Sequence, residues 1–154
     1  MKKIQLAMML CCMMFGLQVV AQNVNPDRIL GKYYLESPMT DDEAKVSVEK
    51  AKNGTYFARV LWVNNDKNPD GTPRTDEKNP DPKLRSRRAT DVNIFWNLKF
   101  KKDEWVDGDL YDPFSGKTLG VKVKLHKNGK DLKVRYYMGT PTLGLTNVWT
   151  RLEE

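Results

Sequence analysis

The stretch Leu119-Gly120-Val121-Lys122-Val123-Lys124-Leu125 alternates apolar residues with Lys or Gly. A period of two is typical of a β-strand that has one buried face and one hydrated face. Strong β-branched and aromatic runs also occupy residues 55–63 and 92–100, and weaker runs occupy 29–36, 45–51, 104–111, 132–138 and 145–152. The sequence therefore predicts an all-β fold of eight strands.

We expect the connections between these runs to be hairpin turns. Asn53-Gly54 and Asn128-Gly129 suit tight turns that need positive φ, and Asp112-Pro113-Phe114-Ser115-Gly116 supplies a third reversal. Eight consecutive antiparallel strands hide both sheet edges by closing into an up-and-down barrel. A short helical turn over residues 25–30, with Asn25 as N-cap, would close one barrel end and leave the other open. An interior of this size holds either packed side chains or one small ligand.

The first 21 residues have the features of a secretory signal peptide. Lys2 and Lys3 precede an apolar run over residues 6–20, and Ala21 provides a cleavage point. The run is too short and too interrupted for a permanent transmembrane helix. Bulky residues before Cys11-Cys12 argue against a lipoprotein. We expect cleavage near Ala21, one mature domain over residues 22–154, no stable transmembrane segment after cleavage, and a periplasmic or secreted location.

Composition excludes several classes of function. Both cysteines lie in the leader, so the mature domain has no thiol chemistry. Loss of Lys2 and Lys3 lowers the net charge from +6 to +4, and the mixed charges argue against a nucleic-acid partner. His126 is the only histidine, and no nucleophile motif, metal quartet or phosphate loop is present. The sequence predicts a protein that is not an enzyme and has no cofactor.

The order of short motifs resembles the bacterial domain of unknown function 2147 family. The segments that carry the resemblance span almost the whole mature chain; they are Gly31-Lys32-Tyr33, Asp70-Gly71-Thr72-Pro73 with Asp76, Asn79-Pro80-Asp81-Pro82-Lys83-Leu84-Arg85-Ser86-Arg87, Trp105-Val106-Asp107-Gly108-Asp109-Leu110-Tyr111-Asp112-Pro113 with Gly116-Lys117, Val134-Arg135-Tyr136-Tyr137 with Gly139, Leu143-Gly144, and Trp149-Thr150-Arg151. The chain departs from the family in having Tyr33 where Trp is usual, and Thr90-Asp91 where a Gly follows the arginines. The resemblance implies a secreted protein with a lipocalin-like barrel, and no assigned activity.

The first and last strands also resemble the wider lipocalin-like pattern, in which an arginine of the last strand packs on an aromatic residue of the first. Tyr33 and Arg151 occupy those positions here. The resemblance implies that this pair stabilises the barrel seam, and such a contact contributes about 0.5–2 kcal/mol.

The segment 64–88 is too long for a hairpin loop, so we expect it to have a function or to lack order. Within it, Asp66, Asn68, Asp70 and Glu77 fit the spacing of a calcium loop, with Gly71 at the turn position. The same residue types also occur in ordinary exposed turns, and the flanks read as strand rather than helix. A calcium site is therefore the weaker of two interpretations.

The arginine cluster that follows is a second candidate site. The prolines of Asn79-Pro80-Asp81-Pro82 exclude helix interior and central strand. In an extended segment, Arg85 and Arg87 would point to the same side and could hold a carboxylate or phosphate. The alternative that we favour is an internal salt-bridge network with Asp81 and with acidic residues of the next loop.

Two functional hypotheses remain. In the first, the open barrel end binds a small amphipathic or anionic ligand, and the residues assigned to it are Arg85, Arg87, Trp62, Trp96, Trp105, Tyr111 and Lys117. In the second, the barrel is filled, and the long loop 64–88 docks an envelope partner. A hydrophobic cavity above about 300 Å³ would favour the first hypothesis, and a solid interior with an ordered, exposed loop would favour the second.

Overall fold

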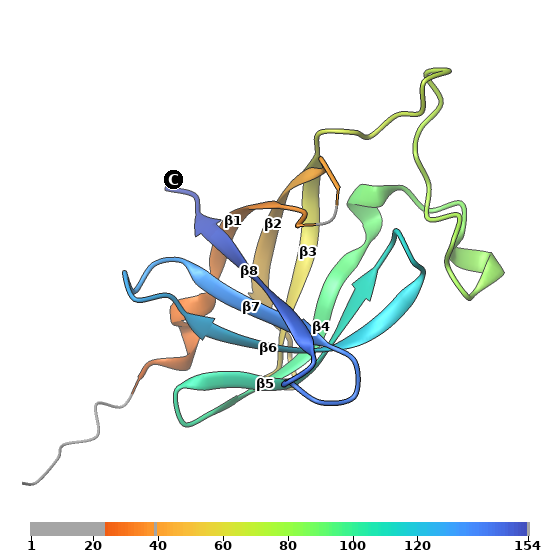
Figure 1. The fold of residues 1–154 in the computed structure, drawn as a ribbon. Helices are drawn as coiled ribbons and strands as arrows, with labels where there is room; N and C mark the ends of the chain where they lie inside the picture. Colours follow the sequence, from red (N-terminus) through yellow and green to blue (C-terminus); the bar gives the residue numbers. More distant parts are fainter. Residues whose placement is uncertain (1–23, 39, 154) are drawn as a thin grey trace, which may run out of the picture.

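The computed structural model describes residues 24–38 and 40–153, and its secondary structure is almost entirely β (Figure 1). The predicted signal peptide, with Cys11, Cys12 and the cleavage point at Ala21, lies outside the described residues. The strands are β1 (Gly31–Glu36), β2 (Glu43–Lys50), β3 (Tyr56–Val63), β4 (Asn93–Lys101), β5 (Glu104–Asp112), β6 (Lys117–Leu125), β7 (Leu132–Tyr137) and β8 (Gly144–Arg151). Three single turns of 3-10 helix are η1 (Pro26–Ile29), η2 (Pro82–Leu84) and η3 (Ala89–Asp91).

Each strand pairs antiparallel with its neighbours in sequence, and β8 pairs with β1 to close the sheet into a barrel. The predicted eight-stranded up-and-down barrel is confirmed. Alternation of side chains places one face of each strand inside, where Val121 and Val123 of β6 are fully buried. The alternation breaks at β-bulges, of which one lies in the β2–β3 pairing between Lys45 and Val46.

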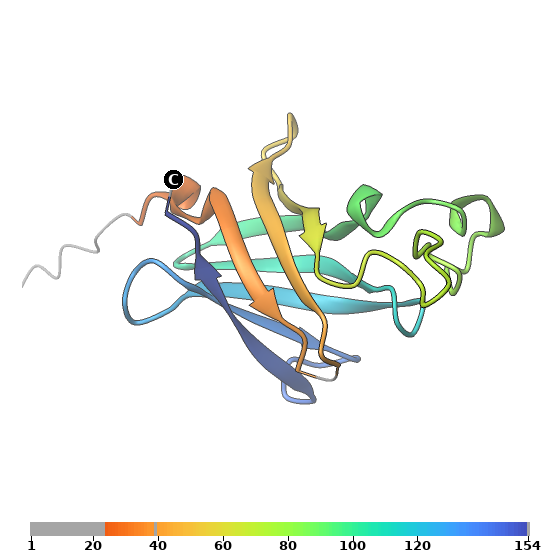
Figure 2. The same ribbon diagram turned by 90° about the horizontal axis from the view of Figure 1, so that it is seen from above.

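Since consecutive strands run up and down, their connections fall alternately at two ends of the barrel (Figure 2). Turn η1 covers the end that holds the β2–β3, β4–β5 and β6–β7 turns. Asn25 caps η1 by accepting a hydrogen bond from the Asp27 amide. The Tyr56 hydroxyl donates to Asp27 at 2.6 Å, and the Trp105 indole donates to the Pro26 carbonyl at 3.1 Å. The contacts of Tyr56 and Trp105 with η1 therefore close this end of the barrel.

The barrel seam is held by Arg151, the last residue of β8. Its guanidinium carbon lies 4.8 Å from the centre of the Tyr33 ring, and it also hydrogen-bonds the Tyr33 hydroxyl. The same guanidinium donates to the carbonyls of Leu30 and Arg28, at 2.8 and 2.6 Å. Glycine is required at position 31, beneath this guanidinium. The φ of Gly31 is +140°, and a Cβ added there would lie 2.4 Å from the Arg151 guanidinium. Tyr33 and Arg151 therefore pack together where β1 meets β8, at the position the sequence predicted for them.

The long β3–β4 connection is ordered and packs against the β5–β6 turn at the opposite end (Figures 1 and 2). The Tyr111 hydroxyl of β5 donates to Asp76 in this connection at 2.5 Å. Gly116 has a φ of +69°, and an added Cβ would lie only 2.0 Å from the Lys78 carbonyl oxygen. The backbone of the two loops is thus in direct contact, so the long connection forms part of the wall of the open end.

The expectation that Arg85 and Arg87 lie on an extended segment is wrong. Pro82 starts the 3-10 turn η2, Arg85 adopts helical backbone angles, and the Arg87 amide donates to the Leu84 carbonyl at 3.1 Å. The chain turns here because proline is favourable at the first position of a helical turn.

Within the described residues, no helix has the length and apolar character needed to cross a bilayer.

Candidate functional site

Two adjoining cavities lie inside the open end of the barrel. Their volumes are about 150 and 130 Å³, and five residues line both of them. These shared residues are Leu35, Ser37, Ile94, Pro113 and Phe114. A cavity of about 150 Å³ with apolar walls can bind a molecule the size of benzene. The two cavities together are therefore large enough for an apolar group the size of about two benzene rings.

The walls of both cavities are mainly hydrophobic because the inward face of each strand stays apolar up to the open end. The first cavity adds Ala44, Val60, Val63, Ala89 and Val92, and the second adds Leu110, Leu119, Val134, Tyr136 and Trp149. Trp149 stacks on Phe95 at a ring separation of 5.6 Å, which places a rigid aromatic wall below the second cavity. Water gains few hydrogen bonds in such a space, so an apolar occupant is favoured.

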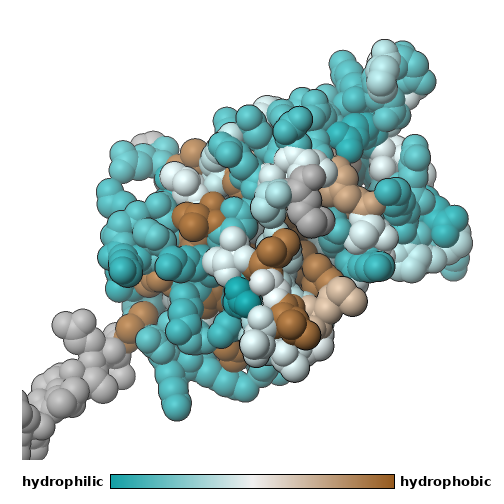
Figure 3. All heavy atoms as spheres, viewed as in Figure 1, coloured by the Kyte–Doolittle hydropathy of each residue, from teal (hydrophilic) through white to brown (hydrophobic). Residues whose placement is uncertain are grey.

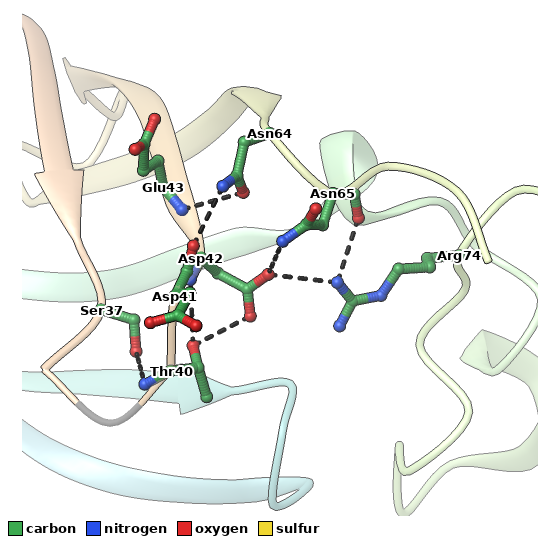
Figure 4. Close-up of polar contacts among 8 residues, drawn as sticks. All are labelled: Ser37, Thr40, Asp41, Asp42, Glu43, Asn64, Asn65 and Arg74. Atoms are coloured by element: carbon green, nitrogen blue, oxygen red, sulfur yellow. Dashed lines mark hydrogen bonds and ion pairs between the residues drawn. The ribbon is translucent and has the colours of Figure 1, made fainter. Parts of the chain in front are cut away.

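A polar cluster forms the rim of the first cavity (Figure 4). Asp42 accepts hydrogen bonds from Asn65, Thr40 and Arg74 at 2.9, 2.9 and 3.1 Å. Burial alone would raise the pKa of the Asp42 carboxyl group, but these hydrogen bonds outweigh burial and hold the pKa below its usual value. The cluster links the β1–β2 loop to the long connection.

A second polar network is buried beneath the long connection. Asp76 is only 3% exposed, and it accepts hydrogen bonds from Arg87, Tyr111 and Asn79 at 2.8, 2.5 and 2.7 Å. The Arg87 guanidinium also lies 5.5 Å from the centre of the Tyr111 ring. Both Asp76 and Tyr111 line the cavities, whereas the Arg87 charge is neutralised by Asp76. The favoured salt-bridge network is therefore present, but its acid is Asp76 rather than Asp81.

The phenol of Tyr111 gives a pH-dependent prediction. Burial and the hydrogen bond to Asp76 raise its pKa to about 12. Because the folded pKa lies above the unfolded value of about 10, the stabilising contribution of Tyr111 is complete below pH 10 and is lost as the pH rises through 12. We expect urea unfolding midpoints of the wild type to fall more steeply between pH 10 and 12 than those of Tyr111→Phe. Equal slopes would contradict this role of the buried phenol.

The structure gathers only part of the predicted ligand site. Tyr111 lines the second cavity, but Arg85 donates to the Asn79 carbonyl at 2.8 Å and stays exposed, and Lys117 is exposed at the start of β6. Among the tryptophans, Trp149 of β8 lines the second cavity, although it was not among the residues assigned to the ligand. The signal that could have identified Leu35 and Ile94 was their place on inward strand faces near the open end, whereas Phe114 lies in the β5–β6 turn.

Three predicted ligand residues lie elsewhere. Trp105 is fully buried at the closed end against η1, so its assignment to the ligand site is wrong. Trp62 is 40% exposed outside the barrel, where the Lys45 ammonium lies 5.3 Å from its ring centre. The bulge in the β2–β3 pairing reverses the alternation and turns Trp62 outward. Trp96 packs beside the core without lining either cavity.

The calcium-loop residues form an ordinary turn. Asp70 accepts hydrogen bonds from the Thr72 amide and hydroxyl at 2.9 and 2.6 Å, and Asn68 bonds the Thr72 hydroxyl at 3.1 Å. Within the ranges 24–38 and 40–153, no three acidic, His or Cys side chains are grouped as metal ligands. Asp66, Asp70 and Glu77 therefore do not converge, which contradicts the calcium interpretation.

Comparisons with known proteins agree with this architecture. A family model described as "Uncharacterized protein conserved in bacteria (DUF2147)" matches residues 31–151. Among solved structures, protein HP1028 of the human pathogen Helicobacter pylori, described as belonging to the lipocalin family, superposes with a TM-score of 0.68. It shares 27% sequence identity, and the match covers 81% of this chain and 83% of that one. A search of curated proteins gave no match.

Proposed function

Because this chain belongs to the DUF2147 family of uncharacterized bacterial proteins and folds as a lipocalin-like barrel, we propose that it binds a small amphipathic molecule in the open end of the barrel and catalyses no reaction. The observation that carries the proposal is the pair of adjoining apolar cavities around Leu35, Ile94 and Phe114. Each cavity is smaller than the roughly 300 Å³ of a typical ligand pocket, so the proposed ligand is a small one. Because the open end is not filled by side chains, the cavities support this hypothesis over a filled barrel that only docks partners.

The cavities also suggest how the ligand lies. Its apolar part occupies the space between Ile94 and Trp149, and its polar part meets the rim near Asn65 and Thr75. We assign no anion site to this rim, since Arg74 is paired with Asp42 and Arg87 with Asp76. The proposed extracytoplasmic location rests on residues 1–21 of the sequence alone.

Binding of the uncharged fluorescent probe 1-naphthol, whose two fused rings and one hydroxyl match the combined size of the cavities and the polar rim, tests the proposal. Replacement Ile94→Trp fills the space shared by both cavities, whereas Leu61→Trp adds the same ring at an exposed site on β3. We expect Ile94→Trp to weaken probe binding by at least about tenfold, because tenfold corresponds to only about 1.4 kcal/mol of lost apolar burial. Leu61→Trp should bind as the wild type does.

Circular dichroism and urea unfolding of both variants control for damage to the fold. If a folded Ile94→Trp protein binds the probe as tightly as the wild type, or if the wild type does not bind it, the cavities are not the binding site and the proposal is wrong.

A further inference from the structure

A third cavity lies between the long connection and the β5–β6 turn. Its volume is about 240 Å³, larger than that of either cavity inside the barrel, and five of the seven residues that line it are polar or charged. These five are Asn68, Arg74, Thr75, Glu77 and Lys78. Hydrophilic residues likewise cover the long connection in the space-filling view, whereas hydrophobic surface gathers in the middle of the same face (Figure 3). The third cavity is therefore a polar space beside two apolar ones.

The polar and apolar spaces meet at a small set of side chains. Four residues line both the third cavity and the first, namely Arg74, Thr75, Pro113 and Phe114. Pro113 and Phe114 line the second cavity as well. The aromatic ring of Phe114 therefore stands where all three cavities come together.

Three of these four residues are fixed in place. The Arg74 guanidinium donates to the Asp42 carboxylate at 3.1 Å. Thr75 lies in a β-bridge that joins the two sides of the long connection. The side chain of Pro113 is closed on its own backbone, so it has no rotamer to change. Phe114 is the member of the set that can move.

The backbone that carries Phe114 is held, while its ring is not. The Phe114 amide donates to the Asp112 carboxylate at 3.0 Å, and the Gly116 amide donates to the Asp112 carbonyl at 2.8 Å. Among the described residues, the hydrophobic side chains that pack against the buried core do not include Phe114. The Arg74 guanidinium lies 5.8 Å from the ring centre, which is a weak contact. Because the ring borders open space in all three cavities, a change of rotamer moves it with little loss of packing.

We propose that Phe114 is a movable partition, and that the third cavity binds the polar head of a ligand whose apolar part lies inside the barrel. When the ring turns aside, the three cavities join into one space that exceeds the roughly 300 Å³ of a typical ligand pocket. The inference rests on the proposed function and adds the class of the ligand, which is an apolar group of about two rings with an uncharged, hydroxylated head.

The charges around the third cavity favour an uncharged head. Arg74 is neutralised by its ion pair with Asp42. Glu77 and Lys78 are both exposed and contribute one charge of each sign, so the cavity attracts neither an anion nor a cation as a whole. A hydroxyl group can donate to a carboxylate and accept from an ammonium group, which suits this lining.

Three ligands with the same rings test the third cavity. They are 1-naphthol, its glyceryl ether, which adds an uncharged diol head, and its carboxymethyl ether, which adds an anionic head. The glyceryl ether should bind the wild type about tenfold more tightly than 1-naphthol, because its head adds one or two net hydrogen bonds. The carboxymethyl ether should gain less. A glyceryl ether that binds no more tightly than 1-naphthol, or less tightly than the anionic ether, would overturn the assignment of the head.

A matched pair of variants places the head. Lys78→Trp adds a ring at a residue that lines the third cavity and neither of the other two, so it should remove the gain of the glyceryl ether and leave 1-naphthol binding unchanged. Lys52→Trp, at an exposed lysine in the β2–β3 turn of the closed end, should keep the gain. Equal gains in both variants would contradict the location in the third cavity.

Stopped-flow fluorescence with the glyceryl ether tests the partition. Phe114→Ala should speed both association and release about tenfold, and Phe114→Trp should slow both, because the ring sets the barrier to passage. Loss of a simple contact would speed release and leave association unchanged. Leu143→Ala is the control, since Leu143 is 72% exposed in a loop of the same barrel end. Unchanged association in variants that circular dichroism shows to be folded, or equal changes in Leu143→Ala, would overturn the partition.

Failure of this inference can be distinguished from failure of the proposed function. Binding of 1-naphthol that Ile94→Trp weakens supports the two cavities inside the barrel, whatever the longer ligands and the Phe114 variants show. If the wild type binds none of the three ligands, both proposals are wrong.

Discussion

Replacement Asp76→Ala should destabilise the protein by about 3 kcal/mol, because it removes the acidic partner of a buried ion pair. The carboxylate is 1% exposed and Arg87 is 25% exposed, so the arginine would be left largely without solvation or a counter-charge. Tyr111 and Asn79 would lose their acceptor at the same time. We expect the long connection to detach from β5 and to expose the first cavity.

Urea unfolding measures the loss of stability, and hydrogen exchange of residues 64–92 measures the detachment of the loop. The matched control is Asp81→Ala, since Asp81 is an exposed carboxylate of the same loop that accepts a hydrogen bond from the Lys83 amide. Loss of that N-terminal cap should cost about 1 kcal/mol. Similar losses for both variants would show that Asp76 has no special role in holding the loop.

Replacement Arg151→Ala should also cost about 3 kcal/mol, because one guanidinium serves several groups at the barrel seam. It donates to three backbone carbonyls, those of Leu30, Arg28 and Lys130, in addition to its contacts with Tyr33. Removal of the side chain leaves the partly buried Leu30 carbonyl without its donor and removes the cation–π contact with Tyr33, while water can replace the two exposed bonds. Arg151→Lys keeps the charge but cannot form the same fork of hydrogen bonds, so an intermediate loss is expected.

Thermal and urea unfolding of the Arg151 variants check this prediction. Arg59→Ala is the control, because Arg59 is an exposed residue of β3 whose ion pair with Glu49 lies on the outer surface. Exposed pairs of this kind contribute about 1 kcal/mol or less. If Arg151→Ala unfolds no earlier than Arg59→Ala, the seam does not depend on the arginine.

The strand pattern and turn residues were sufficient to predict the barrel. Period-two alternation identified all eight strands, and Gly54 and Gly129 adopt the expected positive φ. Asn53 and Asn128 do not, because the Gly54 amide bonds the Ala51 carbonyl and the Gly129 amide bonds the His126 carbonyl, so each turn is wider than the two-residue Asn-Gly turn that was expected. These features are local, because a strand's alternation and a turn's backbone angles depend on adjacent residues. The closing turn at η1 follows from Asn25 and Pro26 for the same reason.

The residues of the site depend on non-local contacts, which the sequence alone did not reveal. The partner of Arg87 is Asp76 because the bridge between Thr75 and Arg88 and the hydrogen bond from the Asp76 amide to the Arg87 carbonyl bring the two sides of the loop together. A further 35 residues separate Asp76 from Tyr111. Trp62 faces outward because of a bulge in its pairing with β2, which no residue type marks. Trp105 could have been placed correctly, since it follows the β4–β5 turn, and an up-and-down order puts that turn at the end covered by η1.

Native mass spectrometry of the protein isolated from the cells that produce it tests the central claim most directly. The account predicts that the folded wild type carries a small molecule, that unfolding releases it, and that Ile94→Trp, which fills the shared cavity, carries much less. A wild-type protein whose mass equals that of the bare chain, or an Ile94→Trp protein that retains the same molecule to the same extent, would contradict ligand binding in the open end of the barrel.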